Sequence, residues 1–252
     1  MRVVEASEIE SIASGEVPRH VGCIMDGNGR WALMRDLARS KGHAAAEPAV
    51  RAAVETSLEL GVEWLTVYAF STENWKRPVA EVAYLMNFRR WLLHKDRVDE
   101  LHRKNVRIRF AGERDVRIPA PSRRWMEQCE QQTERNTAMN FVIAFNYGGR
   151  QELVRAASLL ADSAGPRDEA AYQQAMYVPE MPEMDLVIRT SSEFRLSNFF
   201  PWHSAYAELV FTDTLWPDFR RGHFYSAVGE YQARRRRRGE VATPTRAKKG
   251  RK

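Results

Sequence analysis

Short apolar stretches alternate with helical patterns along most of this chain. Six stretches rich in β-branched and aromatic residues are typical of strands, and helical periodicity lies between most of them. This alternation predicts one α/β domain with a central, mostly parallel β-sheet flanked by helices. The expected strands are Val21–Met25, Trp64–Phe70, Val106–Ala111, Met139–Phe145, Asp185–Arg189 and Glu208–Phe211, and the expected helices cover 45–60, 80–104, 120–136, 150–163 and 219–238.

Length and composition favour a single large domain over two small ones. The chain has 252 residues, of which 44% are hydrophobic, enough for one full core. Its two cysteines, Cys23 and Cys129, are far apart, which indicates neither a disulfide framework nor a zinc site. The first twenty residues carry acids and no apolar core, and no apolar run reaches about 18 residues. We therefore expect a cytoplasmic protein.

The formal net charge of +6 is unevenly distributed. Residues 240–252 contain five Lys and Arg and one Glu, so the rest of the chain is only slightly basic. The charge therefore does not indicate a nucleic-acid-binding surface. We expect a lead-in segment over 1–17, a main domain over 18–239 and a disordered basic tail over 240–252, with an anionic membrane surface as a candidate contact of that tail.

The stretch Val21–Trp31 reads as a strand that runs into a glycine-rich turn and then into a helix. Such a turn exposes backbone N–H groups, and Arg30 adds a positive charge, so the segment suits a phosphate group. Asp26 would repel that phosphate unless a metal ion bridged them. This predicts Mg²⁺ on a bound diphosphate. An ordinary surface turn remains the alternative for Asp-Gly-Asn-Gly alone.

Further polar side chains follow the other expected strands, where ligands collect in parallel sheets. Arg39 and His43 are one helical turn apart and would share a face. Arg189, Arg195 and Ser197 suit a second diphosphate. Glu208, at the start of an apolar run, is the candidate for a second metal-binding carboxylate. The segment 80–104 is expected to form one helix whose broad face packs in the core or lines a long hydrophobic cavity, through Glu81, Val82, Leu85, Met86, Phe88, Leu92 and Leu93.

The motifs MDGNGRWA, FSTENWKRP, NYGGRQE, DLVIRT and AYAELVFTD occur in order between about residues 18 and 237. This series resembles the cis-prenyltransferases, specifically the bacterial undecaprenyl and decaprenyl diphosphate synthases. The resemblance implies a homodimer whose 18–239 segment is a catalytic domain with a hydrophobic tunnel. It further implies repeated condensation of isopentenyl diphosphate onto an allylic diphosphate, such as farnesyl or geranyl diphosphate, with each new double bond in the Z geometry.

The resemblance also implies a role for individual residues. Asp26 and Asn74 would be catalytic, Asn74 by assisting proton removal. Asp26 and Glu208 would bind Mg²⁺, with Glu208 from this chain or from the partner subunit. The allylic diphosphate would be held by Gly27, Asn28, Gly29, Arg30 and Arg39, and the isopentenyl diphosphate by Arg189, Arg195 and Ser197. Trp31, His43, Ser71, Thr72, Glu73, Trp75, Arg77 and Leu196 would complete the substrate site.

The chain departs from the family pattern at several positions, which leaves the product open. Ser192 and Phe194 replace the usual Gly and Gln, and Phe200, Pro201, Trp202 and His203 replace Leu-Leu-Trp-Gln. Tyr84 and Leu92 look large for tunnel positions, and 236–239 differs from the usual Arg-Arg-Phe-Gly. The main prediction is a long-chain precursor of a cell-wall lipid carrier. A short-chain or irregular Z-prenyl diphosphate synthase and a catalytically silent partner subunit are the alternatives.

Overall fold

The structure is a computed structural model and describes residues 4, 6–90 and 92–234. The basic tail over 240–252 and the departure at 236–239 lie outside the described residues. None of the described helices is both long and apolar enough to span a bilayer.

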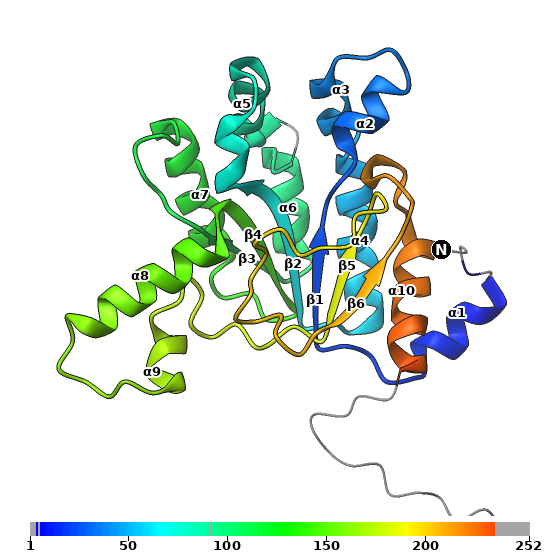
Figure 1. Ribbon diagram of the computed structural model, residues 1–252. Helices are drawn as coiled ribbons and strands as arrows, with labels where there is room; N and C mark the ends of the chain where they lie inside the picture. Colours follow the sequence, from blue (N-terminus) through cyan, green and yellow to red (C-terminus); the bar gives the residue numbers. More distant parts are fainter. Residues whose placement is uncertain (1–3, 5, 91, 235–252) are drawn as a thin grey trace, which may run out of the picture.

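A six-stranded sheet forms the centre of the molecule, with every neighbouring pair of strands parallel (Figure 1). The strand order is β3-β4-β2-β1-β5-β6, so the chain passes from β1 through β2 to the edge strand β3, returns to insert β4 between β3 and β2, and then crosses to β5 and β6 on the other side of β1. The predicted α/β fold is confirmed, and all six strands lie within two residues of the expected bounds at either end. The strands are β1 His20–Ile24, β2 Trp64–Ser71, β3 Val106–Ala111, β4 Met139–Tyr147, β5 Leu186–Arg189 and β6 Glu208–Phe211.

Helices cover one face of the sheet, and a long irregular segment covers much of the other. The larger core joins β1, β2 and β4 to α4, α6, α7 and α10 through Val54, Val98, Met126 and Phe224. On the opposite face, side chains from 176–200 pack against β2 and β4. The helices are α1 Ala6–Ala13, α2 Asn28–Leu33, α3 Arg39–Ala44, α4 Glu47–Leu60, α5 Val79–Met86, α6 Lys95–Arg103, α7 Ala120–Thr133, α8 Gly149–Ala161, α9 Glu169–Gln174 and α10 Arg221–Ala233, with 3-10 turns η1 Thr72–Lys76, η2 Phe88–Arg90 and η3 Trp216–Asp218.

The prediction of one continuous helix over 80–104 is wrong. The segment divides into α5, η2 and α6. Asn87 ends α5 with a non-helical backbone (φ −95°, ψ 42°). His94 begins α6 by accepting a hydrogen bond from the Arg97 N–H at 3.3 Å. The apolar spacing continues through the break, because Phe88, Leu92 and Leu93 are all buried in the same core.

His203, one of the departures, lies buried in contact with Phe200 and within 3.3 Å of the Gln173 amide nitrogen. Burial, with a smaller effect of nearby His20, lowers the pKa of His203 from 6.5 to about 3. Below pH 6.5 the unfolded chain therefore binds a proton that the folded chain rejects, and the free energy of unfolding falls as the pH falls.

We expect His203→Gln to reduce this loss of stability by about 1 kcal/mol per pH unit between pH 6 and 4. Urea unfolding at several pH values measures the effect. Since buried His20 also titrates, with a pKa lowered to about 4 by burial, part of the pH dependence will remain. An unchanged slope in the variant would show that His203 does not contribute to acid sensitivity.

Candidate active site

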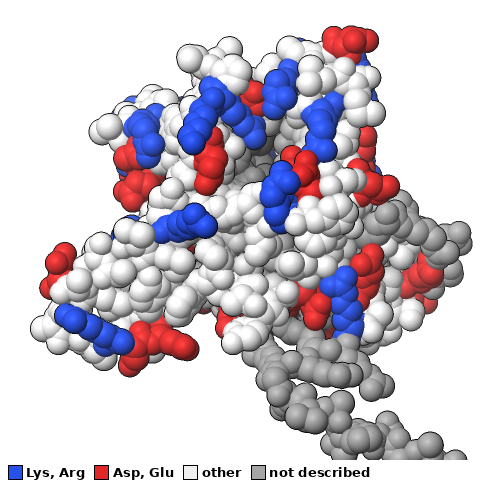
Figure 2. All heavy atoms as spheres, viewed as in Figure 1, with Lys and Arg blue, Asp and Glu red and all other residues white. Residues whose placement is uncertain are grey.

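A cavity of about 800 Å³ opens at the carboxyl ends of the central strands. Segments that follow β1, β2, β4 and β5 all contribute to its wall, as expected for a parallel sheet. Figure 2 shows Lys and Arg side chains gathered around a hollow at this end of the molecule. Eleven predicted site residues line the cavity: Asp26, Asn28, Arg30, His43, Ser71, Glu73, Asn74, Arg77, Arg189, Arg195 and Ser197.

The glycine turn after β1 has the backbone that its sequence predicts. Gly27 has a φ of 103°, which an L side chain rarely adopts, and it directly precedes α2. Gly29 allows a close approach, because a Cβ there would lie 2.6 Å from the guanidinium of Arg39. The turn therefore brings Arg39 from α3 against the first turn of α2.

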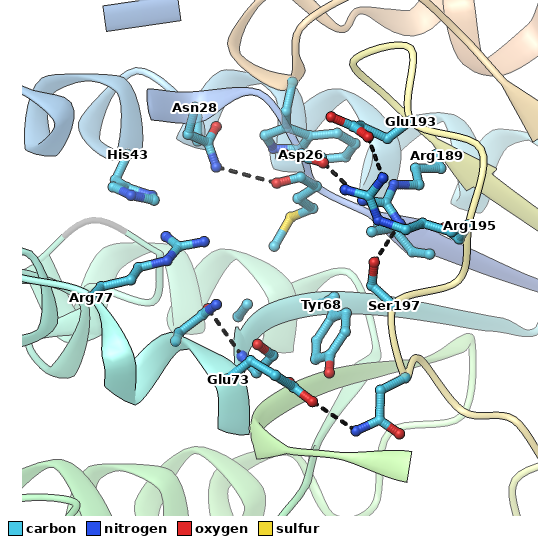
Figure 3. A pocket seen from close by; sticks show the side chains of 18 of the residues that line it. Asp26, Asn28, His43, Tyr68, Glu73, Arg77, Arg189, Glu193, Arg195 and Ser197 are labelled. Carbon is cyan, nitrogen blue, oxygen red and sulfur yellow. Dashed lines mark hydrogen bonds and ion pairs between the residues drawn. The ribbon is translucent and has the colours of Figure 1, made fainter. Parts of the chain in front are cut away.

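Asp26 is held at the end of β1 by its backbone and its carboxylate. Its N–H donates to the Thr190 hydroxyl at 3.0 Å, and its carbonyl accepts from that hydroxyl at 2.7 Å. One carboxylate oxygen accepts from Arg189 Nη2 at 2.9 Å, and Arg189 Nη1 donates to Ser197 Oγ at 2.7 Å. These contacts place the predicted metal-binding acid beside the predicted second diphosphate site (Figure 3).

Glu193 was not assigned a role from the sequence, yet it lines the cavity. One carboxylate oxygen lies 3.2 Å from Arg30 Nη2, and the other accepts from Arg195 Nη1. Arg30 also donates to the Ser191 carbonyl at 2.9 Å and lies 3.7 Å from Asp26. Asp26, Arg30, Glu193 and Arg195 thus form a row of alternating charges along the cavity wall.

On the opposite wall a buried carboxylate joins two arginines and a histidine. Glu81 accepts from Arg39 at 2.9 Å, from Arg77 at 2.9 Å and from His43 at 3.0 Å. Burial alone would raise the pKa of Glu81, but hydrogen bonds from His43 and Arg39 and the charge of Arg77 lower it below its usual value. Burial in turn lowers the pKa of His43 despite its bond to Glu81. The sequence placed Glu81 on an apolar face. In the structure Glu81 is instead surrounded by Arg39, Arg77 and His43.

We expect Glu81→Gln to lower the free energy of unfolding by about 2 kcal/mol at pH 7, because three donors lose a charged acceptor. A carboxyl with a lowered pKa contributes stability above its unfolded value and loses it as the pH falls through the folded value. The difference between variant and native protein should therefore shrink below pH 4.5. Urea unfolding gives both values. Glu55→Gln, which removes a half-exposed partner of Lys104, is the control and should have little effect.

The segment after β2 is organised by its own hydrogen bonds. The Asn74 side-chain carbonyl accepts from the Ser71 N–H at 3.1 Å, which ties the two residues together at the cavity wall. Trp75 donates to Asn146 at 2.7 Å and packs edge-to-face on Phe70, so it lies behind the wall. Glu73 accepts from Asn198 at 2.9 Å on the far rim. Gly27, Gly29, Trp31, Arg39, Thr72, Trp75 and Leu196 adjoin the lining residues without being among them.

Glu208 and Asp26 do not come together within one chain. Glu208 begins β6 and is paired in register with Leu186, at the amino end of β5. Asp26 follows the carboxyl end of β1, about 15 Å farther along the strand direction. Glu208 instead forms an ion pair with Arg234 at 3.0 Å. A metal site with both carboxylates requires Glu208 from a second chain.

The cavity fits a metal diphosphate better than a bare metal ion. Among the described residues no group of three or more His, Cys, Asp or Glu side chains could enclose a metal. Asp26 is one carboxylate, one-third exposed, beside Arg30 and Arg189. Arg189 Nε is buried and has no hydrogen-bond partner among the described residues. One acidic ligand among arginines suits Mg²⁺ whose remaining ligands are phosphate oxygens and water.

The floor of the cavity is apolar. Met25, Ala46 and Ala69 line it and also pack against the larger core. Phe70, which follows Ala69 in β2, is fully buried with Phe88 and Phe145, and the Phe145 ring centroid lies 5.5 Å from Phe70 and 4.8 Å from Phe88. These three rings are hereafter the Phe70–Phe88–Phe145 cluster.

Comparison with known proteins identifies the family. A model described as putative undecaprenyl diphosphate synthase matches residues 24–239. A trans,polycis-polyprenyl diphosphate synthase of Thermobifida fusca, described as (2Z,6E)-farnesyl diphosphate specific, is 47% identical over 88% of this chain and 81% of its own. An isoprenyl transferase of Bacillus subtilis is 44% identical over 92% of this chain and 91% of its own.

Solved structures agree. Lavandulyl diphosphate synthase from Lavandula x intermedia, in complex with dimethylallyl diphosphate, has a TM-score of 0.82 and 31% identity over 89% of this chain and 99% of its own. A probable undecaprenyl diphosphate synthase from Campylobacter jejuni has a TM-score of 0.71 and 28% identity over the same shares. The family model covers most of the chain, and the relatives match along most of their own length. The chain therefore belongs to the undecaprenyl diphosphate synthase family and is a cis-prenyltransferase.

Proposed function

We propose that this enzyme condenses isopentenyl diphosphate with an allylic diphosphate, with Mg²⁺, to give a Z-prenyl diphosphate. The observation that carries the proposal is the layout of one cavity. Arginines from the segments after β1 and β5 stand on either side of Asp26, directly above an apolar floor. Two anionic head groups and one hydrocarbon tail fit such a cavity.

In this proposal each wall has a separate task. Arg30 and Arg39, with the turn at Gly27, hold the allylic diphosphate, while Arg189, Arg195 and Ser197 hold the other diphosphate. The arginines stabilise the negative charge that grows on the allylic diphosphate as its carbon–oxygen bond breaks. Mg²⁺ bound by Asp26 would add further charge stabilisation to that leaving group.

The alkene electrons of isopentenyl diphosphate form the new bond from its terminal CH2 carbon to the allylic carbon as the allylic diphosphate leaves. The tertiary carbon beside the new bond becomes cationic, and a proton then leaves the CH2 group on its diphosphate side to form the new double bond. Asn74 and Ser71 are tied together at the cavity wall. We propose that they orient and relay this proton, since an amide is too weak a base to act alone.

We further propose that the active form is a homodimer. Glu208 is too far from Asp26 in the same chain to share a metal with it. The second carboxylate would then come from Glu208 of the other chain, once its ion pair with Arg234 opens.

We infer the product length from the residues behind the floor. Phe70 follows the floor residue Ala69 in β2, and its ring packs with Phe145 on β4, which packs in turn with Phe88 on η2. We therefore favour a short-chain product over a long lipid-carrier precursor, because each added isoprene unit would have to displace a packed ring.

Product analysis tests the proposal. The protein is incubated with Mg²⁺, labelled isopentenyl diphosphate and, separately, dimethylallyl, geranyl or farnesyl diphosphate, and the dephosphorylated products are sized. A short Z-prenyl product is the expected result. A ladder that extends to ten or eleven units would restore the lipid-carrier prediction. No product from any primer would contradict the proposed activity and support the silent-subunit alternative.

A further inference from the structure

Glu193 contacts residues of both proposed diphosphate sites. Its two carboxylate oxygens bind two arginines from different parts of the chain, Arg30 near the end of β1 and Arg195 after β5. In the function proposed above, on which this inference rests, Arg30 belongs to the allylic diphosphate and Arg195 to the isopentenyl diphosphate. One side chain therefore touches both anion sites.

The backbone around Glu193 is fixed in an unusual conformation. Ser191 and Ser192 have φ values of 82° and 55°, in the left-handed region that favours glycine. Their N–H groups donate to the carbonyls of Thr214 and Thr212, both at 2.9 Å. These contacts fix the backbone next to Glu193. Its carboxylate can therefore move only by a change of side-chain rotamer.

Arg30 does not depend on Glu193 for its position. Its Nη1 donates to the Ser191 carbonyl, and its Nη2 also lies near Asp26. When the Glu193 carboxylate moves away, the Arg30 guanidinium therefore keeps two contacts and stays at the cavity wall. Glu193 is 28% exposed and has room to turn outward.

We propose that Glu193 is a positioning residue that couples the binding of the two diphosphates. In the empty cavity its carboxylate takes the place of a phosphate oxygen on both arginines. The first diphosphate to arrive must displace it, because two anions cannot share these donors. The displaced carboxylate leaves both arginines, and the second diphosphate binds without that free-energy cost. Each substrate thus raises the affinity for the other.

Binding measurements test the coupling without any turnover. Isopentenyl diphosphate is titrated by calorimetry, with Mg²⁺ present, into the free protein and into protein saturated with geranyl thiolodiphosphate, whose carbon–sulfur bond does not ionise. The coupling factor is the ratio of the two dissociation constants. We expect Glu193→Gln to lower this factor at least about fivefold and to strengthen binding of the first ligand alone.

Two further variants show whether the coupling depends on the contact of Glu193 with both arginines or only on its negative charge. Glu193→Asp keeps the charge but is one methylene too short to reach both arginines, so its coupling factor should also fall. Glu113→Gln removes a negative charge at the same edge of the sheet, just after β3, at a carboxylate that accepts from the Tyr177 hydroxyl and not from either arginine. Its coupling factor should stay near that of the native protein.

The outcomes are distinct. If both ligands bind and the coupling factor is the same in the native protein and both Glu193 variants, the coupling role is wrong and the proposed function stands. An equal fall in the Glu113 variant would also overturn it, since general charge would then explain the effect. If neither diphosphate binds to the folded native protein, the proposed function itself fails.

Discussion

Asp26→Asn is expected to lower turnover about a hundred- to a thousandfold while the fold stays intact. The carboxylate accepts from its own neighbour Gly27 and from Arg189, and the isosteric amide can keep the first of these contacts. It cannot supply a negative charge to a metal ion, and its NH2 group would face the Arg189 guanidinium. Asp26 is one-third exposed but the Arg189 side chain is only 4% exposed, so the variant leaves a buried guanidinium without its charged acceptor, and the expected loss of stability is about 2 kcal/mol.

Steady-state kinetics with saturating Mg²⁺ and urea unfolding measure the two effects separately. Asp36→Asn is the matched control. Asp36 lies in the exposed turn after α2 with a φ of 54°, a conformation that asparagine also tolerates. The control should keep native turnover. Activity of Asp26→Asn within tenfold of native would show that Asp26 is not the metal-binding acid.

The sheet and the location of the cavity were predictable from the sequence because they depend on local patterns. Apolar stretches with β-branched and aromatic residues formed all six strands, and polar groups after Ile24, Ser71 and Arg189 met at one edge. The same rule, applied to Glu208, would have placed it at the opposite edge, since it begins its strand. The position of Glu208 at the start of an apolar stretch could therefore have shown, from the sequence alone, that it lies far from Asp26 in the same chain.

The break at Asn87 and the roles of Glu81 and Glu193 could not be predicted in this way. Apolar spacing continues across Asn87, and the break depends on one backbone conformation and on the His94 cap. Glu81 owes its environment to Arg39, which is 42 residues away, and Glu193 owes its bridge to Arg30, which is 163 residues away. Local periodicity carries no information about such contacts.

Phe145→Ala is expected to lengthen the product by one or more isoprene units. Phe145 lies on β4 and packs against both Phe70 and Phe88. Its truncation would open space beside Phe70, the chain neighbour of the floor residue Ala69, and each buried CH2 of a growing chain that used this space would gain about 0.8 kcal/mol. Sizing of the dephosphorylated products, with the same primer for native protein and variant, measures the change.

Phe141→Ala is the matched control for Phe145→Ala. Phe141 is buried on the same strand and in the same core, four residues nearer the amino end and so about 13 Å deeper. Both truncations should lower stability by about 3–5 kcal/mol, but only the one at Phe145 should change the product. Phe145→Leu removes less volume and should give a smaller lengthening in a more stable protein. Unchanged products from both Phe145 variants would show that the Phe70–Phe88–Phe145 cluster does not limit the chain, whereas lengthening by Phe141→Ala as well would mean that the limit lies deeper in the core.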